Sequence, residues 1–270
     1  MLRADEPKAN RPLSLLEFSI RSASQAYGRE YVLRVLLRHP LRALRGVLAY
    51  ARLAPKAGPG TTRLVQSSED AFLERAVGDG PRLLVGTGFC QKPLRAAGSA
   101  ADCPAGRFNH ACLYLARLEL GAENPMLSHA ACAVCPVHVL GQAALRAGAS
   151  FAVLTSALDI AQDILLPALE QRRFTRVLFA ICPYSVQPMS LALLTCGLEG
   201  CLFPYASGAC CDYEQWLRAD RGDKPGCTVL APGETSNLLK LLDAVAARRS
   251  ALDVPGGTHY AYADHVYRPL

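Results

Sequence analysis

The sequence predicts an α/β protein, with a small doubly wound, mainly parallel sheet, covering helices and a preceding N-terminal helical segment. Short apolar runs alternate with helical patterns along the middle of the chain, which is typical of parallel strands joined by right-handed crossovers. The 270 residues are 51% hydrophobic and 19% charged. That composition excludes a disordered chain and is sufficient for one large core.

Turn residues and caps bound each predicted element. The predicted strands are residues 82–87, 150–154, 176–182 and 201–205. The predicted helices are residues 67–76, 139–147, 159–169, 189–198, 212–218 and 234–249. Gly148 and Gly200 follow two of these helices, in the position where glycine commonly ends a helix.

The net charge of +6 belongs to residues 1–56, which hold 11 Lys or Arg against 4 acids. Ser14 and Glu17 form a capping box ahead of apolar residues at helical spacing, so we expect helices here. These helices either pack on the body with a solvated arginine face, or present a basic amphipathic surface to an acidic membrane or acidic partner. Nucleic acid is not an expected partner, because the arginines alternate with leucines rather than aromatic residues.

Residues 54–62 indicate a linker, since they contain two prolines and two glycines. We therefore expect a basic amphipathic segment (1–56), a cysteine-rich α/β domain (63–250) and a C-terminal tail (251–270). The tail is expected to be disordered or draped over the surface, and the alternative is a lid that carries His259 and His265. With no membrane-spanning stretch and no secretory leader recognised, we expect a cytoplasmic protein, either free or peripheral at the membrane.

Eleven cysteines are the most unusual feature of the composition. An odd number in a chain without a recognised leader argues against a disulfide framework and favours metal binding or redox chemistry. Eight lie where the topology could gather them at the carboxyl edge of a parallel sheet: Cys90, Cys103, Cys112, Cys132, Cys135, Cys182, Cys210 and Cys211. We interpret Cys196, Cys201 and Cys227 as small buried or incidental residues.

The tightest motif is Cys132-x-x-Cys135, which puts two thiolates on one turn. Cys103 and Cys112 complete a set of four metal ligands, and His129 is a further candidate ligand or supporting donor. Soft sulfur ligands favour zinc or iron–sulfur clusters over calcium or magnesium, although a Cys-x-x-Cys can also be a redox dithiol. Because the thiols outnumber the four that one zinc needs, we expect one or two iron–sulfur clusters, such as 4Fe–4S, with zinc as the alternative. The remaining edge cysteines, Cys90, Cys182, Cys210 and Cys211, are expected to contribute to cofactor binding.

Common catalytic motifs are absent from the sequence, including the phosphate-binding, dinucleotide-binding and nucleophile-elbow patterns. Whether the protein is an enzyme therefore stays open. Asp159 and Asp163 are a candidate carboxylate pair on one helix face, although acids in a first helical turn are also favoured by the helix dipole. Asp159, Ser156 and Tyr184 are the weak catalytic candidates, because each follows a predicted strand near the cysteine edge.

Several motifs between residues 82 and 211 resemble one known family: the Asp-Cys-Pro-Ala stretch 102–105, the Cys132-x-x-Cys135 knuckle, the strand ending at Cys182, and Cys210. This part of the chain is similar to the uncharacterised polycysteine family known as domain of unknown function 116. The resemblance implies a cytosolic α/β metal-binding domain behind an apolar or basic N-terminal segment, and it supplies no reaction. His129 stands where the family tends to have a third knuckle cysteine, and Cys211 is an additional cysteine.

These observations together predict a cysteine-ligated metal protein, with an iron–sulfur cluster preferred, in a redox or electron-transfer accessory role beside a redox partner protein. One alternative is a metal-dependent enzyme that acts on a small substrate at the cluster edge. The other is a zinc-bound adaptor that docks through its basic N-terminus.

Overall fold

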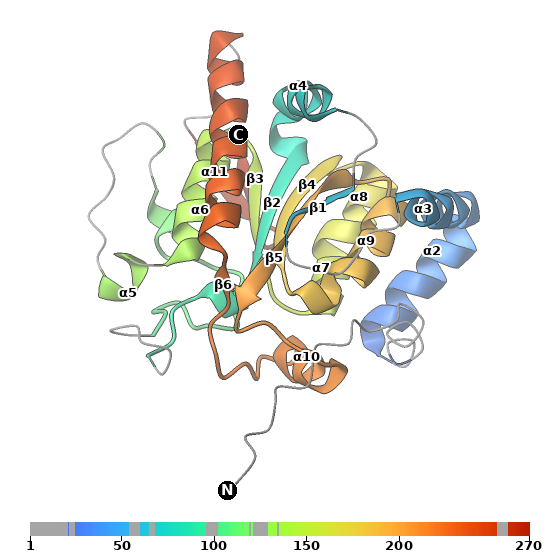
Figure 1. Ribbon diagram of the computed structural model, residues 1–270, viewed down its shortest axis with the longest axis horizontal. Helices are drawn as coiled ribbons and strands as arrows, with labels where there is room; N and C mark the ends of the chain where they lie inside the picture. Colours follow the sequence, from blue (N-terminus) through green and yellow to red (C-terminus); the bar gives the residue numbers. More distant parts are fainter. Residues whose placement is uncertain are drawn as a thin grey trace, which may run out of the picture.

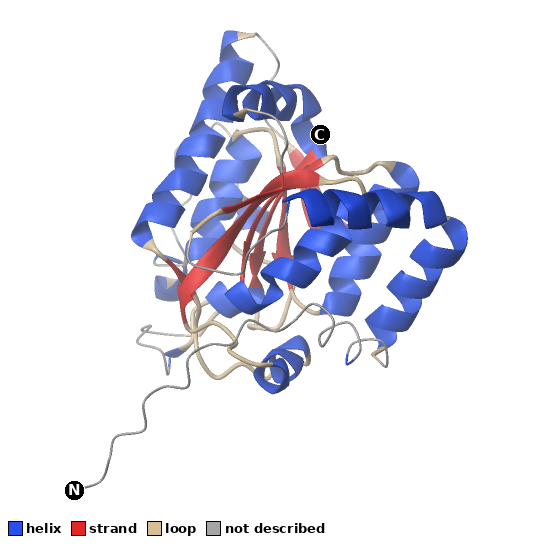
Figure 2. Ribbon diagram, turned by 45° about the vertical axis from the view of Figure 1, so that its right-hand side comes forward, coloured by secondary structure: helices blue, strands red, loops and turns tan. Residues whose placement is uncertain are grey.

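The computed structural model describes residues 21, 25–53, 60–64, 68–95, 102–118, 120, 129–133, 135–252 and 259–270. A mixed sheet with a parallel centre runs through the molecule and helices cover it, which confirms the α/β class (Figures 1 and 2). The predicted capping box of Ser14 and Glu17 and most of the predicted linker lie outside the described residues.

The sheet has the strand order β1-β5-β4-β2-β3-β8-β7, and β6 pairs with β5. Its strands are β1 (Thr62–Leu64), β2 (Leu83–Gly88), β3 (Ser150–Leu154), β4 (Arg176–Ile181), β5 (Glu199–Ser207), β6 (Val229–Leu230), β7 (Tyr260–Ala263) and β8 (Val266–Pro269). The pairs β2–β3, β2–β4 and β4–β5 are parallel, and they comprise the four strands expected from the sequence. The outer strands pair antiparallel.

The central strands are apolar along their length because both faces of the sheet are covered. Every residue of β3 and β4 is buried, which is typical of parallel strands between two helical layers. Successive side chains of β2 point to opposite faces: Leu83 and Val85 join one hydrophobic cluster and Leu84 joins the other. The sheet therefore separates two cores.

Figure 1 shows α6 and α11 on one side of the sheet and α3, α8 and α9 on the other. The first layer consists of α4 (Glu69–Asp79), α6 (Pro136–Arg146) and α11 (Pro232–Ala251). The second consists of η1 (Gly28–Val32), α2 (Leu33–Arg38), α3 (Pro40–Leu53), α7 (Ala157–Ile160), η6 (Ala161–Leu165), α8 (Leu166–Gln171) and α9 (Val186–Thr195). The short helices are η2 (Gly80–Arg82), η3 (Phe89–Gln91), η5 (Leu115–Arg117), α5 (Ala130–Ala133) and η7 (Pro183–Ser185), and α10 (Tyr213–Asp220) lies beyond the ends of the strands.

The N-terminal helices pack directly on the body. Gly46 of α3 lies so close to α9 that a Cβ at this position would sit 2.4 Å from the Cα of Thr195. Arg42 donates a 2.8 Å hydrogen bond to the carbonyl oxygen of Leu169, and the Tyr31 hydroxyl donates to that of Ala192. The opposite face leaves apolar side chains exposed, namely Val32, Leu33, Leu36, Leu37, Leu41, Leu44, Val47 and Leu48.

The expectation of a C-terminal tail is corrected for residues 259–270. They form the hairpin β7–β8, which extends the sheet beside β3. Tyr267 is fully buried, and its hydroxyl bonds both the backbone N–H and the carbonyl of Cys112. Asp264 and His265 form the hairpin turn with positive φ values of 48° and 60°, as a tight two-residue turn requires. The usual Asn-Gly signal is absent from this turn, which is why the sequence pattern did not indicate a hairpin.

The close contact of α3 with α9 predicts the effect of adding one methyl group. Gly46→Ala is expected to lower the free energy of unfolding by about 1–3 kcal/mol, because the new Cβ meets the backbone of Thr195 and forces the helices apart. Gly78→Ala is the matched control, since nothing lies within 4 Å of a Cβ at this exposed helical position. It should raise stability by about 0.5–1 kcal/mol. Urea denaturation measures both, and equal effects would contradict the packing described.

Candidate functional site

Most residues that bear on function lie at the carboxyl edge of the parallel strands. Cys90 follows β2, Thr155 follows β3, Cys182 follows β4 and Cys210 follows β5. Loops from neighbouring strands meet at such an edge, which is where α/β proteins commonly bind ligands. Three groups of side chains are found there.

The first group, here named the four-cysteine group, consists of Cys103, Cys112, Cys132 and Cys135. Cys132 and Cys135 each lie close enough to Cys103 and Cys112 for the thiolate charges to repel. Cys132 belongs to α5 and Cys135 is the N-cap of α6, whereas the other two come from the loop after η3. In the described part of the chain, no three of these sulfur atoms lie within 4.8 Å of one another.

Backbone N–H groups point at two of these sulfurs. Cys135 accepts hydrogen bonds from the backbone N–H groups of Val137 and His138 at the start of α6. Cys112 accepts them from the N–H groups of Tyr114 and Leu115. Such donors stabilise thiolate charge and are a usual support for cysteine ligands of metals and clusters.

Lys92 lies at the centre of the loop that carries Cys103 and Cys112. Its side chain is 1% exposed, and Nζ donates hydrogen bonds to the carbonyl oxygens of Gly106, Asn109 and Ala111. The thiolate charges of the neighbouring cysteines oppose the lowering of the Lys92 pKa by burial. The ammonium group therefore fixes the conformation of the loop through these hydrogen bonds, and it places positive charge beside the thiols.

Three cysteines of the four-cysteine group are thiols of raised pKa. Burial raises the pKa of Cys112, Cys132 and Cys135, that of Cys135 to about 12, and the neighbouring thiolates raise each of them further. Without a compensating charge these groups stay protonated. A bound metal would reverse this balance and displace the thiol protons.

The second group, here named the cavity cysteines, consists of Cys90, Cys182 and Cys210. The Thr228 hydroxyl donates to the sulfur of Cys90 at 3.1 Å, and Lys224 Nζ donates to that of Cys210 at 3.3 Å. The thiol of Cys182 donates a hydrogen bond to Cys210. This bond, aided by Lys224, lowers the pKa of Cys210 to about 6, whereas the pKa of Cys182 is raised.

These three thiols line a cavity of about 170 Å³. Its other walls are mainly apolar and include Tyr27, Tyr31, Leu154, Ile181, Met189 and Trp216. At its base the buried hydroxyl of Tyr205 donates to the carbonyl oxygen of Ala180 and accepts from the N–H of Gly88. The cavity therefore combines an apolar wall with a thiolate of lowered pKa.

Arg107 connects the two groups of cysteines. Its guanidinium donates to the carbonyl oxygens of Cys90, Lys92, Lys224 and Gly226. The Cys227 thiol also donates to the carbonyl of Lys92, at 3.4 Å. The loop of the four-cysteine group is thus fixed to the segment that supplies Lys224 to the cavity.

The other predicted site residues have different surroundings. Cys211 is exposed and donates to the carbonyl of Ala209 at 3.6 Å, and it does not line the cavity. His129 accepts the Ala131 N–H at 3.3 Å, within the first turn of α5.

Of the weak catalytic candidates, Ser156 and Asp159 form the capping box of α7, and Tyr184 is buried in η7. Hydrogen bonds from Thr155 and Ser156 outweigh burial and lower the pKa of Asp159. The capping interaction gives Ser156 and Asp159 a structural role at the start of α7.

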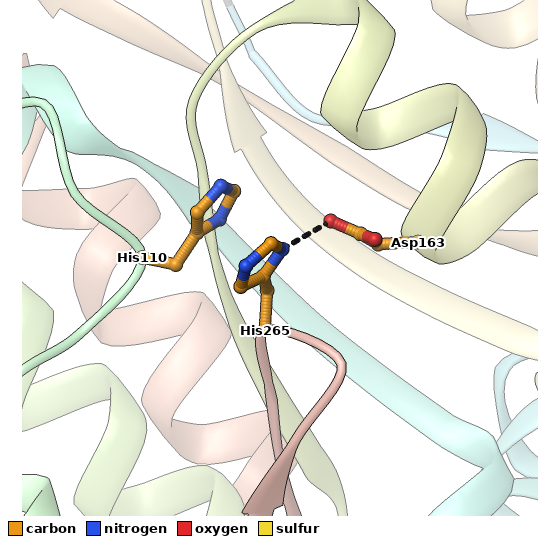
Figure 3. Close-up of side chains that lie close together, drawn as sticks. All are labelled: His110, Asp163 and His265. Atoms are coloured by element: carbon orange, nitrogen blue, oxygen red, sulfur yellow. Dashed lines mark hydrogen bonds and ion pairs between the residues drawn. The ribbon is translucent and has the colours of Figure 1, made fainter.

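The third group was not foreseen from the sequence. His110, Asp163 and His265 meet beside β3, with their ligand atoms all within 4.8 Å of one another (Figure 3). They come from the cysteine loop, from η6 and from the β7–β8 turn. No local pattern links residues so far apart in the chain, and only the pairing of β8 with β3 brings them together.

Comparison of the chain with family profiles, with curated proteins and with solved structures gave no significant match. The resemblance to the polycysteine family therefore stays a sequence-based prediction. Among the residues that the structure describes, no helix is both long and apolar enough to cross a bilayer.

The contacts of Cys210 predict an ionisation below the ordinary thiol range. The thiolate of Cys210 is measured as the ultraviolet absorbance that the wild-type protein shows and Cys210→Ser lacks. We expect this difference to reach half its full size near pH 6, because Cys182 and Lys224 stabilise the anion. Lys224→Met should shift this midpoint to higher pH, whereas Lys240→Met, an exposed lysine of α11, should leave it unchanged. An unshifted midpoint in Lys224→Met would contradict the assigned role.

Proposed function

We propose that this protein is a cysteine-ligated iron–sulfur protein with a redox or electron-transfer accessory role, in which Cys103, Cys112, Cys132 and Cys135 hold a cluster. The observation that carries the proposal is the proximity of four thiols from two loops, three of which also lie near the buried ammonium group of Lys92. An all-sulfur donor set of this kind suits soft metals.

The surplus of thiols at the carboxyl edge favours a cluster over a single zinc ion, because the cavity cysteines add three to the four that one zinc needs. Four sulfurs at about 2.3 Å from one zinc lie about 3.8 Å from one another. Among the described residues, no three of these sulfurs come within 4.8 Å of one another, so the group as it stands is not closed around a single zinc ion. The backbone N–H donors at Cys112 and Cys135 are the support that cluster sulfurs usually receive.

The protein's own charges would set the reduction potential. A bound cluster supplies reversible one-electron transfer, and its reduction adds negative charge to the site. The ammonium group of Lys92 and the N–H groups of α6 offset that charge, which favours the reduced state. Cys103 and Cys132 are only half-buried, and Phe108 and Leu113, 43% and 42% exposed, offer apolar contacts to a redox partner protein beside this loop.

We also infer that the parallel strands form a doubly wound sheet. Their order is β3-β2-β4-β5. The helix that follows β2 covers one face of the sheet, and the helix that follows β4 covers the other. Ligands of doubly wound sheets bind at the carboxyl ends of the two strands where the order reverses, here β2 and β4. Cys90 and Cys182 directly follow these two strands.

This position supports a second candidate function, a metal-dependent enzyme that acts on a small substrate. The specific observation is the apolar cavity of about 170 Å³ with Cys90, Cys182 and Cys210 in its wall. In this function the three thiols would be the candidate ligands of a metal or a second cluster, with one coordination position left for the substrate. A largely apolar molecule would fit the remaining walls.

The predicted docking of residues 1–56 on an acidic membrane surface or partner stays a prediction. Its support within the described residues is the exposed face of α2 and α3, where Leu37 and Leu41 are 78% and 71% exposed. Arg34, Arg38 and Arg45 belong to the same helices.

Iron and acid-labile sulfide measured after purification without oxygen test the proposed function. The wild-type protein should contain both and show a broad visible absorption that bleaches on reduction. Cys132→Ser and Cys135→Ser should each lose most of this iron, because each removes one ligand of the four-cysteine group. Cys211→Ser, at an exposed thiol outside the group, should retain it.

The same measurements separate the alternatives. About one zinc per chain with no iron would refute the cluster and favour the adaptor. Iron that is partly lost in Cys182→Ser, and further lost in the Cys132→Ser, Cys182→Ser double variant, would indicate a second cluster at the cavity. A protein without iron in every preparation would refute the proposal.

A further inference from the structure

We propose that His110, Asp163 and His265 form a binding site for a divalent transition-metal ion of the Zn²⁺ class, separate from the cysteines. Their ligand atoms all lie within 4.8 Å of one another, and His265 Nδ1 is 2.8 Å from Asp163 Oδ2 (Figure 3). Two imidazoles and one carboxylate are a common donor set for zinc, with a fourth position left for water or substrate. The site shares no ligand with the four-cysteine group, so it stands or falls independently of the proposed function.

Room for an ion exists at this point. A hollow of about 10 Å³, roughly the space of one water-sized sphere, is lined by His110, Asp163 and His265 together with Thr155 and Asp159. Leu154, Thr155 and Ile160 line both this hollow and the large cavity. An ion bound here would therefore lie just behind the wall of the cavity.

The hydrogen bonds of His110 leave the lone pair of its Nε2 close to two oxygen atoms. Nδ1 lies 3.1 Å from the carbonyl oxygen of Val153, which fixes the ring hydrogen on Nδ1. Nε2 then presents its lone pair at 3.0 Å from the Thr155 hydroxyl oxygen and 3.4 Å from Asp159 Oδ2. Because the Thr155 hydroxyl donates to Asp159, a neutral His110 places acceptors opposite one another, and a bound cation would satisfy them. A metal-ligating histidine usually donates its other ring N–H to a carbonyl in this way.

The supports of the other two ligands are unusual. Asp163 lies in η6, a π-helical turn, and such turns are frequent at functional sites. His265 has a φ of 60°, in the left-handed region that disfavours side chains with a Cβ. Arg173 fixes the same turn through a 2.9 Å ion pair with Asp264. The backbone thus holds His265 in place at some conformational cost.

Ligation requires one rearrangement. The rings of His110 and His265 are stacked, with centroids 4.0 Å apart and an angle of 6° between the planes, so both cannot aim at one ion as they stand. The side chain of His265 is 51% exposed, and it can turn out of the stack without displacing the core. The ion would then join the cysteine loop, η6 and the C-terminal hairpin.

Cobalt and zinc titrations of the full-length protein test the site. Metal bound per chain is measured by elemental analysis after gel filtration, and Co²⁺ spectra distinguish the ligands, because only cysteine ligation gives intense thiolate-to-metal charge-transfer bands. The wild-type protein should bind one ion more than His265→Gly or Asp163→Asn, and this ion should add no charge-transfer band. His259→Ala, a histidine of the same C-terminal segment outside the group, should match the wild type.

His265→Gly also controls for misfolding. Glycine suits the left-handed turn, so the metal-free variant should melt at the same temperature as the wild type or higher. The wild type and His259→Ala should gain thermal stability on addition of Zn²⁺, whereas His265→Gly and Asp163→Asn should not. Equal metal uptake by the wild type, His265→Gly and Asp163→Asn would overturn the proposal, and so would an additional ion that is lost in Cys132→Ser. The iron content of the four-cysteine group should be the same in the wild type, His265→Gly, Asp163→Asn and His259→Ala.

Discussion

The buried ammonium group of Lys92 is the constraint on which the cysteine-bearing edge depends. A lysine that is 1% exposed must find acceptors inside the protein, and Lys92 finds three carbonyl oxygens of the following loop. Those bonds determine the course of residues 102–112, and hence where Cys103 and Cys112 lie relative to the turn of Cys132 and Cys135. The same charge also offsets the thiolates. Both the structure and the electrostatics of the four-cysteine group therefore depend on the side chain of Lys92.

The parallel sheet decides which groups become neighbours. Strands β2, β3, β4 and β5 all end at one edge of the sheet, and the loop that follows each strand carries polar or thiol side chains at that edge. Arg107 then ties the loop of the four-cysteine group to the segment that carries Lys224. A metal at either cysteine group and an ion at His110 would share loops and one cavity wall.

Local patterns were sufficient for the α/β class and for the four central strands, because apolar runs buried on both faces carry a strong signal. The Cys132-x-x-Cys135 spacing and the rule that parallel strands end at one edge also led to the four-cysteine group. Lys92 gave no such signal, since its three acceptors are backbone atoms of a loop without periodicity. The hairpin β7–β8 was missed because Asp264 and His265 are not the residues that usually form its turn. Without the hairpin, the meeting of His110 with His265 could not be foreseen.

The hydrogen bonds between Tyr267 and Cys112 have a consequence for biosynthesis. The hydroxyl that fixes the backbone of Cys112 is translated 155 residues after it. At about 5–20 residues per second, the ribosome needs roughly 8 to 30 seconds to cover that distance. During this interval Cys112 is made but its loop cannot close. The cluster that we propose would therefore be inserted after translation of β8, and the nascent thiols would need protection from oxidants until then.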